Sequence, residues 1–513
     1  MIDQKASIVA PPAKKTTEVV SPEADKAANL TIIRIGGEMT TKAPRTRQRY
    51  QQAMRRNLVE ALNRNGIAHS LDMVDARLLL RTEDRPAALG VLPRVFGLGS
   101  FSPVEAITDA TVEAIVRTGR EIFADKVKGK RYAVRCKRIG PRTFSALDVE
   151  RQLGAALNDG ATVDLTNPEI TVRAEVFGGH AYLFAGRNIG ASGLPPGIHG
   201  RTLALISGGF DSAVAAWRLM RRGAAVDFLF CNLGGLAYER QVLQVTKVLT
   251  EAWGFGQHPR LYVVDFTEPV ADIQAHARPA YWQVVLKRYF YRAACQIAAE
   301  TGAEAIITGE ALGQVSSQTL ANLRAIDGAS NLPVYRPLIG LDKQEIVDQA
   351  RHIGTAPLSE KVKEYCAISP KRPVTAATPE KVDAQEVDLD PAILIAAVCA
   401  RRDIDLDKLT AIDLRAPYLF ADDIPAGAVV LDFQPQHMFD SWHVPGASNR
   451  DPAALVENYR KLDKDKTYIL YCTFGTQTPV LAELMQQAGF DAYAFRGGIS
   501  RVRRYADAEA LNA

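Results

Sequence analysis

A short glycine-rich run, Ser207-Gly208-Gly209-Phe210-Asp211-Ser212, carries the clearest chemical signal in this sequence. It lies between an apolar stretch that predicts a strand and a periodic stretch that predicts a helix. The glycines allow a tight turn that presents several backbone N–H groups at one point, and the helix adds its positive N-terminal end. We therefore expect the loop to bind phosphate groups, with Asp211 helping to place Mg²⁺, because hard cations prefer carboxylate and phosphate oxygens. The alternative is an ordinary turn before a capped helix.

Residues further along the chain add to this predicted nucleotide site. Gly309 follows a predicted strand and would allow a ligand to approach the carboxyl end of that strand. Gln314 and Gln318 could form hydrogen bonds with a base or a ribose, and Lys343 belongs to a run expected at the same end. Lys287, on a predicted helix, could bind phosphate or could be a solvated helix lysine.

The SGGxDS pattern of the loop resembles that of the PP-loop ATP pyrophosphatases. The resemblance implies that the loop holds the pyrophosphate of ATP while a nucleophile attacks the α-phosphorus and AMP is transferred. Strands and helices alternate from residue 202 to residue 308, which predicts a doubly wound parallel sheet around this site.

A second reactive group is expected at Cys472, in the run Tyr471-Cys472-Thr473-Phe474-Gly475-Thr476-Gln477-Thr478. An apolar strand precedes the cysteine and a helix follows it, so the loop between them can surround the sulfur with N–H groups. Such a thiolate can carry an additional sulfur atom as a persulfide; the alternative is an inert cysteine at a strand end. With Asp432 at the end of a strand and His443 after a helix, this region resembles a rhodanese domain. Gln434 stands where rhodaneses usually have an arginine.

The other cysteines divide into one accessible thiol and four structural ones. Cys366 lies in a polar, Pro- and Lys-rich stretch, so its thiol is expected to be accessible. The remaining four are expected to be buried small hydrophobes: Cys136, Cys231, Cys295 and Cys399. No tight cysteine cluster is present, which argues against a disulfide framework or a structural zinc site.

Charge is distributed unevenly along the 513 residues. Residues 30–187 hold 25 Lys and Arg against 17 Asp and Glu, a balance of +8 in a chain whose total is only +4. This basic first half predicts a surface that binds a polyanion, although a solvated arginine-rich face is about as plausible. The densest positive cluster forms a predicted phosphate-facing strip, and its residues are Lys128, Lys130, Arg131, Arg135, Lys137, Arg138 and Arg142.

The length predicts about three or four domains, and composition shifts suggest where they end. We expect a flexible tail (1–29), a ferredoxin-like α+β domain (30–97), a second α+β domain (98–190), an α/β domain around the phosphate loop (191–374), a linker with a short helix (375–425) and a last α/β domain (426–513). The chain lacks a secretory signal and an apolar run long enough to span a membrane, so we expect a cytoplasmic protein.

From about residue 30 onward, the chain resembles the ThiI family, the tRNA uridine 4-sulfurtransferases or 4-thiouridine synthases. Two runs, FSALDVER (144–151) and LTNPE (165–169), are similar to those of THUMP domains, which bind RNA. The other runs that carry the resemblance are SGGFDS, NLGG (232–235), TGEALGQVSSQTLANLRAID from Thr308, EYCAIS and YCTFGTQT.

The resemblance implies a reaction in several steps. The ferredoxin-like and THUMP domains would bind the acceptor stem of tRNA, and the PP-loop domain would adenylate O4 of uridine-8. An IscS-type cysteine desulfurase would load sulfur onto Cys472, and the persulfide would attack the activated carbon. Cys366 would then form a disulfide with Cys472. The family also supplies sulfur to the ThiS carrier in thiamine thiazole synthesis. A homodimer is left open.

By motif position, the resemblance also assigns ATP contacts outside the loop. They are Leu205, Ile206, Phe230, Cys231, Lys287, Gly309 and Gln318. Two alternative functions are a PP-loop enzyme of thiamine synthesis alone, which the basic first half argues against, and a non-catalytic RNA-binding sulfur relay, which the intact SGGFDS argues against.

Overall fold

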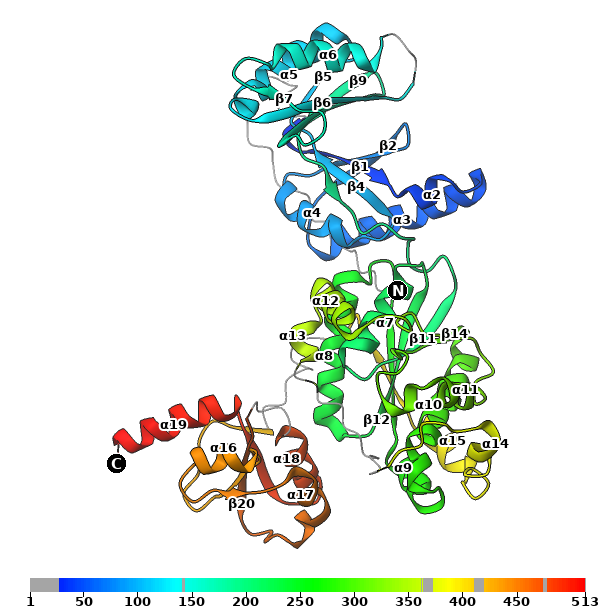
Figure 1. Cartoon of the computed structure of the whole chain (residues 1–513), viewed down its shortest axis with the longest axis vertical. Helices are drawn as coiled ribbons and strands as arrows, with labels where there is room; N and C mark the ends of the chain where they lie inside the picture. The colour runs from blue at the N-terminus through cyan, green and yellow to red at the C-terminus, as the bar shows by residue number, and fades with distance from the viewer. Residues whose placement is uncertain are drawn as a thin grey trace, which may run out of the picture. The chain divides into compact units, whose positions relative to one another are not determined.

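The computed structural model describes residues 27–140, 144–360, 362, 372–409, 419–473 and 478–512 (Figure 1). They form two compact units, one comprising residues up to 40, 62–93 and 98–192, the other comprising 41–61, 94–97 and the residues from 193 onward. Both combine helices and sheets, which confirms the predicted α/β multidomain class. Within the described residues, no helix is long and apolar enough to cross a membrane.

The first sheet of the first unit is antiparallel. Its strands, in spatial order, are β10 (Asn188–Ile189), β4 (Leu98–Pro103), β1 (Leu30–Ile35), β3 (Arg77–Arg81) and β2 (Ser70–Val74). The sequence analysis began the second domain at residue 98, whereas β4 pairs with β1 and so belongs to this sheet. The partner of a strand does not follow from its own residues, which is why this pairing was missed. The same unit contains α2 (Gly37–Thr40) and α4 (Arg85–Val91), whereas most of α3 (Pro44–Arg64) belongs to the other unit.

The second sheet of this unit is mixed. Its order is β5 (Ala106–Asp109), β9 (His180–Phe184), β8 (Ile170–Phe177), β6 (Arg131–Arg138) and β7 (Thr162–Val163), with β6 parallel to β8. Two helices, α5 (Val112–Val127) and α6 (Ala146–Ala156), pack against it around a common apolar core. Ser145 and Asp148 form a capping box that begins α6.

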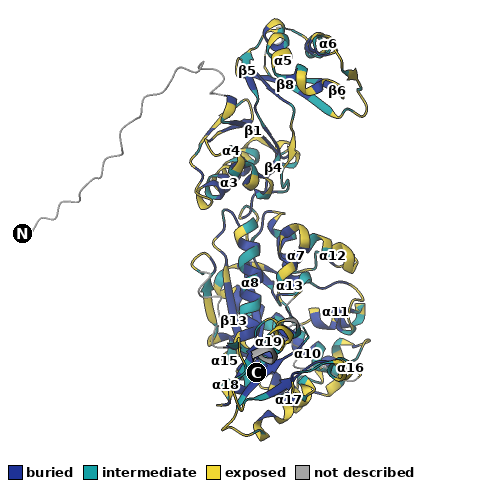
Figure 2. Ribbon diagram, turned by 90° about the vertical axis from the view of Figure 1, so that its left-hand side faces the viewer, coloured by how far each residue is buried: buried dark blue, intermediate teal, exposed yellow. Residues whose placement is uncertain are grey.

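The third sheet, in the second unit, is the predicted doubly wound parallel sheet. Its order is β15 (Val334–Tyr335), β14 (Ala303–Ile307), β11 (Arg201–Leu205), β12 (Ala225–Asn232), β13 (Arg260–Asp265) and β16 (Arg402–Asp405), and only β16 is antiparallel. One face is covered by α7 (Phe210–Met220), α8 (Gly235–Trp253), α12 (Lys343–Ile353) and α13 (Ala356–Ser359), the other by α9 (Thr267–His276), α10 (Trp282–Thr301) and α11 (Leu320–Asp327) (Figure 1). The strands are buried and the outer helix faces exposed (Figure 2).

Much of the predicted linker 375–425 belongs to this domain, which corrects the sequence analysis. The segment forms α14 (Pro379–Asp383) and α15 (Pro391–Cys399), and then β16, which pairs with β13. Val382, Leu394 and Val398 are buried in the core of the domain. The polar composition of residues 375–390 concealed these anchors, because one apolar residue per turn is enough to hold a short helix against a core.

The last sheet is entirely parallel. Its order is β17 (Phe420–Ala421), β21 (Asp491–Phe495), β20 (Thr467–Tyr471), β18 (Val429–Asp432) and β19 (Ser448–Asn449). Its helices are α16 (Gln436–Ser441), α17 (Pro452–Asn458), α18 (Thr478–Gln487) and α19 (Gly498–Asn512). Apolar cores lie on both faces of the sheet, so its functional groups are left at the strand ends.

Candidate functional site

The glycine-rich loop joins β11 to α7 and is closed by its own serine. The Ser212 hydroxyl accepts a hydrogen bond from the Ser207 N–H (3.2 Å) and donates one to the Gly209 carbonyl (3.3 Å). Gly208 has φ +79°, a conformation that favours glycine. No side chain caps α7, whose N-cap is Gly209. The first turn of the helix is therefore available to an anion.

The loop lies where the strand order of the sheet reverses. β11 pairs with β12 on one side and with β14 on the other, and ligands of open α/β sheets bind at such a point. A Cβ atom on Gly309, just after β14, would lie 2.7 Å from the Asp211 carbonyl carbon and the Ser212 nitrogen. Gly309 was predicted to make room for a ligand; the group that approaches it in the structure is the backbone of the phosphate loop.

Asp211 is held by two side chains from neighbouring segments. Lys343 Nζ and Gln314 Nε2 each lie 2.8 Å from a carboxylate oxygen of Asp211. Lys343 is the first residue of α12, which begins with a capping box formed by Asp342 and Glu345. Gln314 was predicted to contact a base or ribose; in the structure its side-chain nitrogen donates a hydrogen bond to Asp211.

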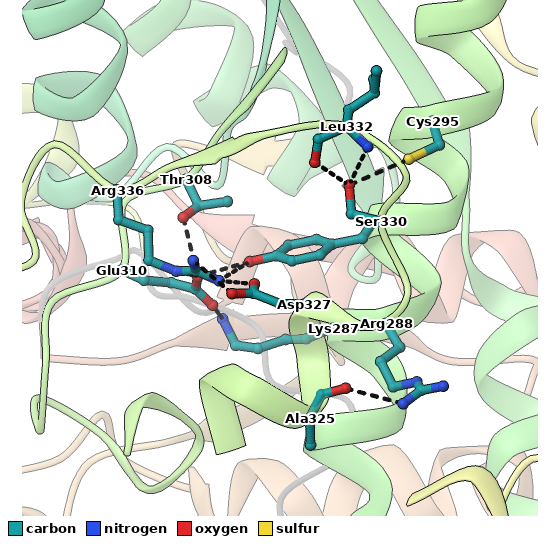
Figure 3. Close-up of polar contacts among 11 residues, drawn as sticks. Lys287, Arg288, Cys295, Thr308, Glu310, Ala325, Asp327, Ser330, Leu332 and Arg336 are labelled. Atoms are coloured by element: carbon teal, nitrogen blue, oxygen red, sulfur yellow. Dashed lines mark hydrogen bonds and ion pairs between the residues drawn. The ribbon is translucent and has the colours of Figure 1, made fainter. Parts of the chain in front are cut away.

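Lys287 belongs to a charged cluster beside the end of β14, as Figure 3 shows. Its Nζ lies 3.0 Å from Glu310 Oε1. The other oxygen, Oε2, accepts hydrogen bonds from Tyr291 Oη (2.8 Å), Thr308 Oγ1 (3.0 Å) and Arg336 Nε (2.8 Å). The carboxylate is thus fixed through one oxygen and offers the other to the lysine.

The charges of this cluster balance. Arg336 also pairs with Asp327, so two cations, Lys287 and Arg336, meet two carboxylates. Burial alone would raise the pKa of Glu310, but Lys287 and Arg336 outweigh it and lower that pKa to about 2. Glu310 and Arg336 had no predicted role. The sequence signal that could have identified Glu310 is an acidic residue directly after the glycine at a strand end.

The remaining predicted ATP contacts lie at the same edge of the sheet. Phe230 and Cys231, near the end of β12, and Ile206, after β11, are buried, whereas Leu205 is half-buried. Burial raises the pKa of the Cys231 thiol well above its usual value, so this cysteine is a packing residue. Gln318 is buried, and its side-chain oxygen has no hydrogen-bond partner in the described part of the chain. A search of those residues finds no group of three or more His, Cys, Asp or Glu that could hold a metal ion.

Cys472 follows β20 and lies against a cavity of about 380 Å³. Its side chain is buried, with 2% of the residue exposed, and it is a free thiol. Gln434, Asn449 and Arg450 contribute to the wall of the same cavity. Residues 474–477, including Gln477, are outside the described residues, as is Cys366.

Asp432 holds Gln434, one of the residues that line this cavity. Its carboxylate accepts hydrogen bonds from the Gln434 backbone N–H (2.7 Å) and from Gln434 Nε2 (2.9 Å). Gln434 is thereby tied to Asp432. Arg450, in the loop after β19, also contributes to the wall of the cavity. The sequence analysis considered an arginine only at position 434 and did not identify this residue. His443 stacks on Phe439 and does not line the cavity.

The expectation for the other cysteines is partly wrong. Cys231 is buried, Cys136 and Cys295 are half-buried, and Cys399 is exposed at the end of α15. Burial, with Glu150 nearby, raises the pKa of the Cys136 thiol to about 11. No disulfide joins cysteines within the described residues.

The predicted basic strip lies along β6 and the turn before it. Lys128, Lys130 and Lys137 are exposed. Arg131 is paired with Asp164 and Glu169 (3.4 Å each), which reduces its contribution to a positive surface. The other arginines have local partners, since Arg135 donates to the Leu165 carbonyl and Arg138 lies over the Phe144 ring. Arg142 is outside the described residues.

A second arginine cluster in the first unit was not predicted. Arg34 and Arg77 both contact Glu175, at 2.7 Å and 3.1 Å. Burial would raise the pKa of Glu175, but the two arginines hold it below its usual value. Burial, with Arg187 nearby, lowers the pKa of Arg173 in the same cluster. Positions 34, 77 and 173 are far apart in the chain, so no pattern within one segment indicates this cluster.

Three parts of the chain match known families. Residues 197–390 match the Thiamine biosynthesis protein (ThiI) family, residues 109–185 match the THUMP domain, and residues 402–504 match the Rhodanese-like domain. The matches cover the nucleotide site, the β6 strip and the Cys472 cavity respectively.

Relatives named tRNA sulfurtransferases match most of the chain. The chain is 39% identical over 474 residues to a tRNA sulfurtransferase of Pyrobaculum aerophilum, which covers 91% of this chain and 96% of the relative. It is 34% identical over 479 residues to a tRNA sulfurtransferase of Pectobacterium atrosepticum, covering 90% and 98%. A crystal structure of a 4-thiouridine synthetase–RNA complex with bound ATP aligns with a TM-score of 0.65 and 28% identity, covering 74% of this chain and 99% of that chain.

Proposed function

Since the chain belongs to the tRNA sulfurtransferase family, we propose that it converts uridine-8 of tRNA to 4-thiouridine, using ATP and a persulfide on Cys472. ATP supplies an adenylyl group that makes the uracil O4 a good leaving group. The observation that carries the proposal is the phosphate loop, with Asp211 held by Lys343 and Gln314, in the same chain as a free cysteine in a cavity.

At the nucleotide site, this chain's own residues bind and orient. The loop 207–212 and the uncapped start of α7 receive phosphate oxygens. Lys287 and Lys343 neutralise charge that develops on the phosphates, which is where preorganised cations contribute most. Gln318, whose buried oxygen lacks a partner, is positioned to accept a hydrogen bond from the nucleotide. Leu205, Ile206, Phe230 and Cys231 form the apolar wall.

Asp211 could ligate Mg²⁺ at this site, but its carboxylate oxygens already have hydrogen-bond partners. Asp211 is a carboxylate at the loop, and phosphate oxygens would provide further hard ligands. Both oxygens of Asp211 already have partners, Lys343 and Gln314, so a metal ion would have to share or displace them.

At the sulfur site, Cys472 accepts a sulfur atom from a cysteine desulfurase as a persulfide. The outer sulfur attacks C4 of the activated uracil and displaces AMP, so that the base is joined to Cys472 through an S–S bond. Cys366 then attacks Cys472 Sγ, which releases the thiolated base and leaves a Cys366–Cys472 disulfide for an external thiol to reduce. Val362 lies within van der Waals reach of Gly208, and Cys366 is four residues further on.

The partners complete the proposal. The β6 strip, including Lys128, Lys130 and Lys137, would bind tRNA phosphates together with Arg131, Arg135, Arg138 and Arg142. The cavity at Cys472 would also pass sulfur to the ThiS carrier for thiamine thiazole synthesis. Since tRNA is the substrate, we place the protein in the cytoplasm. Light scattering of the full chain distinguishes a monomer from the homodimer left open above.

The experiment compares the full chain with its D211A and C472S variants. With an unmodified tRNA transcript, ATP, a desulfurase and cysteine, the wild type should form AMP and 4-thiouridine together. D211A should form neither while its Cys472 still acquires sulfur, and C472S should bind tRNA without thiolating it. Equal 4-thiouridine from wild type and D211A would refute the assigned role of the loop.

A further inference from the structure

The start of α19 lies beside the reactive cysteine. Arg496 follows β21 and Cys472 follows β20, and these strands are parallel neighbours. Both residues therefore lie at the same, carboxyl edge of the sheet. The Ile499 N–H donates a hydrogen bond to the Cys472 carbonyl (3.2 Å), so α19 begins in direct contact with the cysteine's own peptide.

This part of the chain is strongly positive within an acidic domain. Residues 496–504 contain four arginines and no acidic residue, whereas residues 419–513 as a whole hold 9 Lys and Arg against 12 Asp and Glu. We define the α19 arginine face as Arg496, Arg501, Arg503 and Arg504. The net charge of the domain is negative, so the domain as a whole does not attract a polyanion. Any such attraction must come from the α19 arginine face.

The face is built on a fixed support. Val502 is fully buried in the core behind α19, while Arg501, Arg503 and Arg504 are exposed. Asp422 is shared by Arg496 (Nε–Oδ1, 3.0 Å) and Arg501 (2.9 Å), and the Arg503 guanidinium lies over the Trp442 ring. One carboxylate between two guanidinium groups leaves these three side chains with a net charge of +1.

A hollow of about 520 Å³ opens within this face. Its wall is formed by Arg501 and Arg504 together with Asp422, Tyr505 and the buried Phe495. Guanidinium groups bind phosphate oxygens in pairs, and an aromatic ring such as that of the half-buried Tyr505 contacts a ribose or base, so the combination suits a nucleotide unit of an RNA strand.

We propose that the α19 arginine face binds phosphates of the RNA substrate while Cys472 delivers its sulfur. This inference rests on the proposed function. The nucleotide whose base the cysteine reaches is joined to a phosphate on each side. These phosphates must therefore come close to the carboxyl edge of the sheet, at which Arg496 and Cys472 both lie. An acidic sulfur-donor protein is the competing partner for this face, and the experiment separates the two.

The test uses the full chain with Cys472 loaded with sulfur and then separated from the donor. The variant is R501A/R504A, which removes both arginines of the hollow. The matched control is K464A/K466A, which removes two positive charges before β20, at the opposite edge of the same sheet. 4-Thiouridine formed in a single turnover is measured against tRNA concentration and against salt.

We expect R501A/R504A to need about threefold or more tRNA for half-maximal transfer, because two phosphate contacts are lost. The slope of log affinity against log salt should fall by about two in R501A/R504A. The R501K/R504K variant keeps the positive charges and should recover most of the lost affinity and slope. The control K464A/K466A should match the wild type. Loading of Cys472 and the thermal unfolding midpoint should be unchanged.

Three results would overturn the inference. They are unchanged transfer in R501A/R504A, an equal loss in K464A/K466A, and slower loading by the desulfurase with normal transfer, which would assign the face to the donor protein. If the loaded wild type forms no 4-thiouridine, the proposed function fails instead. The salt slope of transcript binding, wild type against R501A/R504A, then still decides whether this face contacts RNA.

Discussion

Lys287 Nζ lies 3.0 Å from Glu310 Oε1, and Glu310 Oε2 is held by Tyr291, Thr308 and Arg336. An ammonium group has three N–H donors, so the contact with Glu310 leaves two for a ligand. Only 4% of the Glu310 side chain is exposed, against 26% for Lys287. The carboxylate therefore acts as an internal support that orients a lysine at the edge of the nucleotide site.

The first prediction concerns this support. E310Q should weaken ATP binding about tenfold, because the neutral amide no longer holds Lys287, and contacting residues couple by about 0.5–3 kcal/mol. In a K287A background, E310Q should add little to the loss already present. Calorimetric titration with ATP of the wild type, both single variants and the double variant measures the coupling.

Asp327 provides the matched control. D327N changes the outer partner of Arg336, a carboxylate with 46% of its side chain exposed, and leaves the Glu310–Lys287 contact in place. Its ATP affinity should stay close to that of the wild type. Additive effects of E310Q and K287A would mean that Glu310 stabilises the fold without acting through Lys287.

The second prediction is a pH dependence of stability. The pKa of Glu310 falls from 4.5 to about 2 in the folded protein. Because the folded-state pKa is lowered, the ionised carboxylate stabilises the fold fully above about pH 4.5, and this stabilisation is lost as the pH falls toward 2. The unfolding free energy of the wild type should therefore exceed that of E310Q by less at about pH 3 than at about pH 5.

Urea unfolding followed by tryptophan fluorescence measures this difference. Three of the four tryptophans lie in the same domain as Glu310: Trp217, Trp253 and Trp282. A difference between wild type and E310Q that stayed constant over this pH range would show that the Glu310 carboxyl is not held ionised by its neighbours.

The third prediction concerns the close approach of two loops. G309A should raise the KM for ATP and destabilise the domain by about 1–3 kcal/mol, because the added methyl would lie 2.7 Å from the backbone at Asp211 and Ser212. G340A is the control, since a Cβ there would meet nothing within 4 Å. ATP kinetics and thermal unfolding of both variants test this. If G309A behaves like G340A, the two loops are not packed as tightly as the structure has them.

Local chemistry was predictable from the sequence, whereas contacts between distant segments were not. The 207–212 loop and the strand before Cys472 are short runs whose residue types determine their conformation, and both are found as expected. The contact of Glu310 with Lys287 and Arg336 depends on how β14, α10 and the loop after β15 meet. No sequence pattern within one segment predicts how these segments contact one another.

The same reason explains the errors. Cys399 belongs to the most apolar stretch of its region, but only one side of the nine-residue helix α15 faces the core, and Cys399 lies on the other. Residues 402–405 read as polar linker, yet they pair with β13 through their backbone, which carries no composition signal. Arg450 reaches the Cys472 cavity from a loop that the sequence alone could not place.

The fourth prediction assigns the cation of that cavity. Gln434 is hydrogen-bonded to Asp432, whereas Arg450 lines the same cavity as Cys472, where a positive charge would favour an anionic persulfide. R450A should slow the loading of Cys472 about tenfold, since a hydrogen bond to a charged group contributes about 1.5–3 kcal/mol. R460A, which removes an arginine that lies over Tyr459, should load normally. Mass spectrometry of the protein during incubation with a desulfurase and cysteine follows the added sulfur. Equal loading rates for R450A and R460A would mean that other groups around Cys472 stabilise the persulfide.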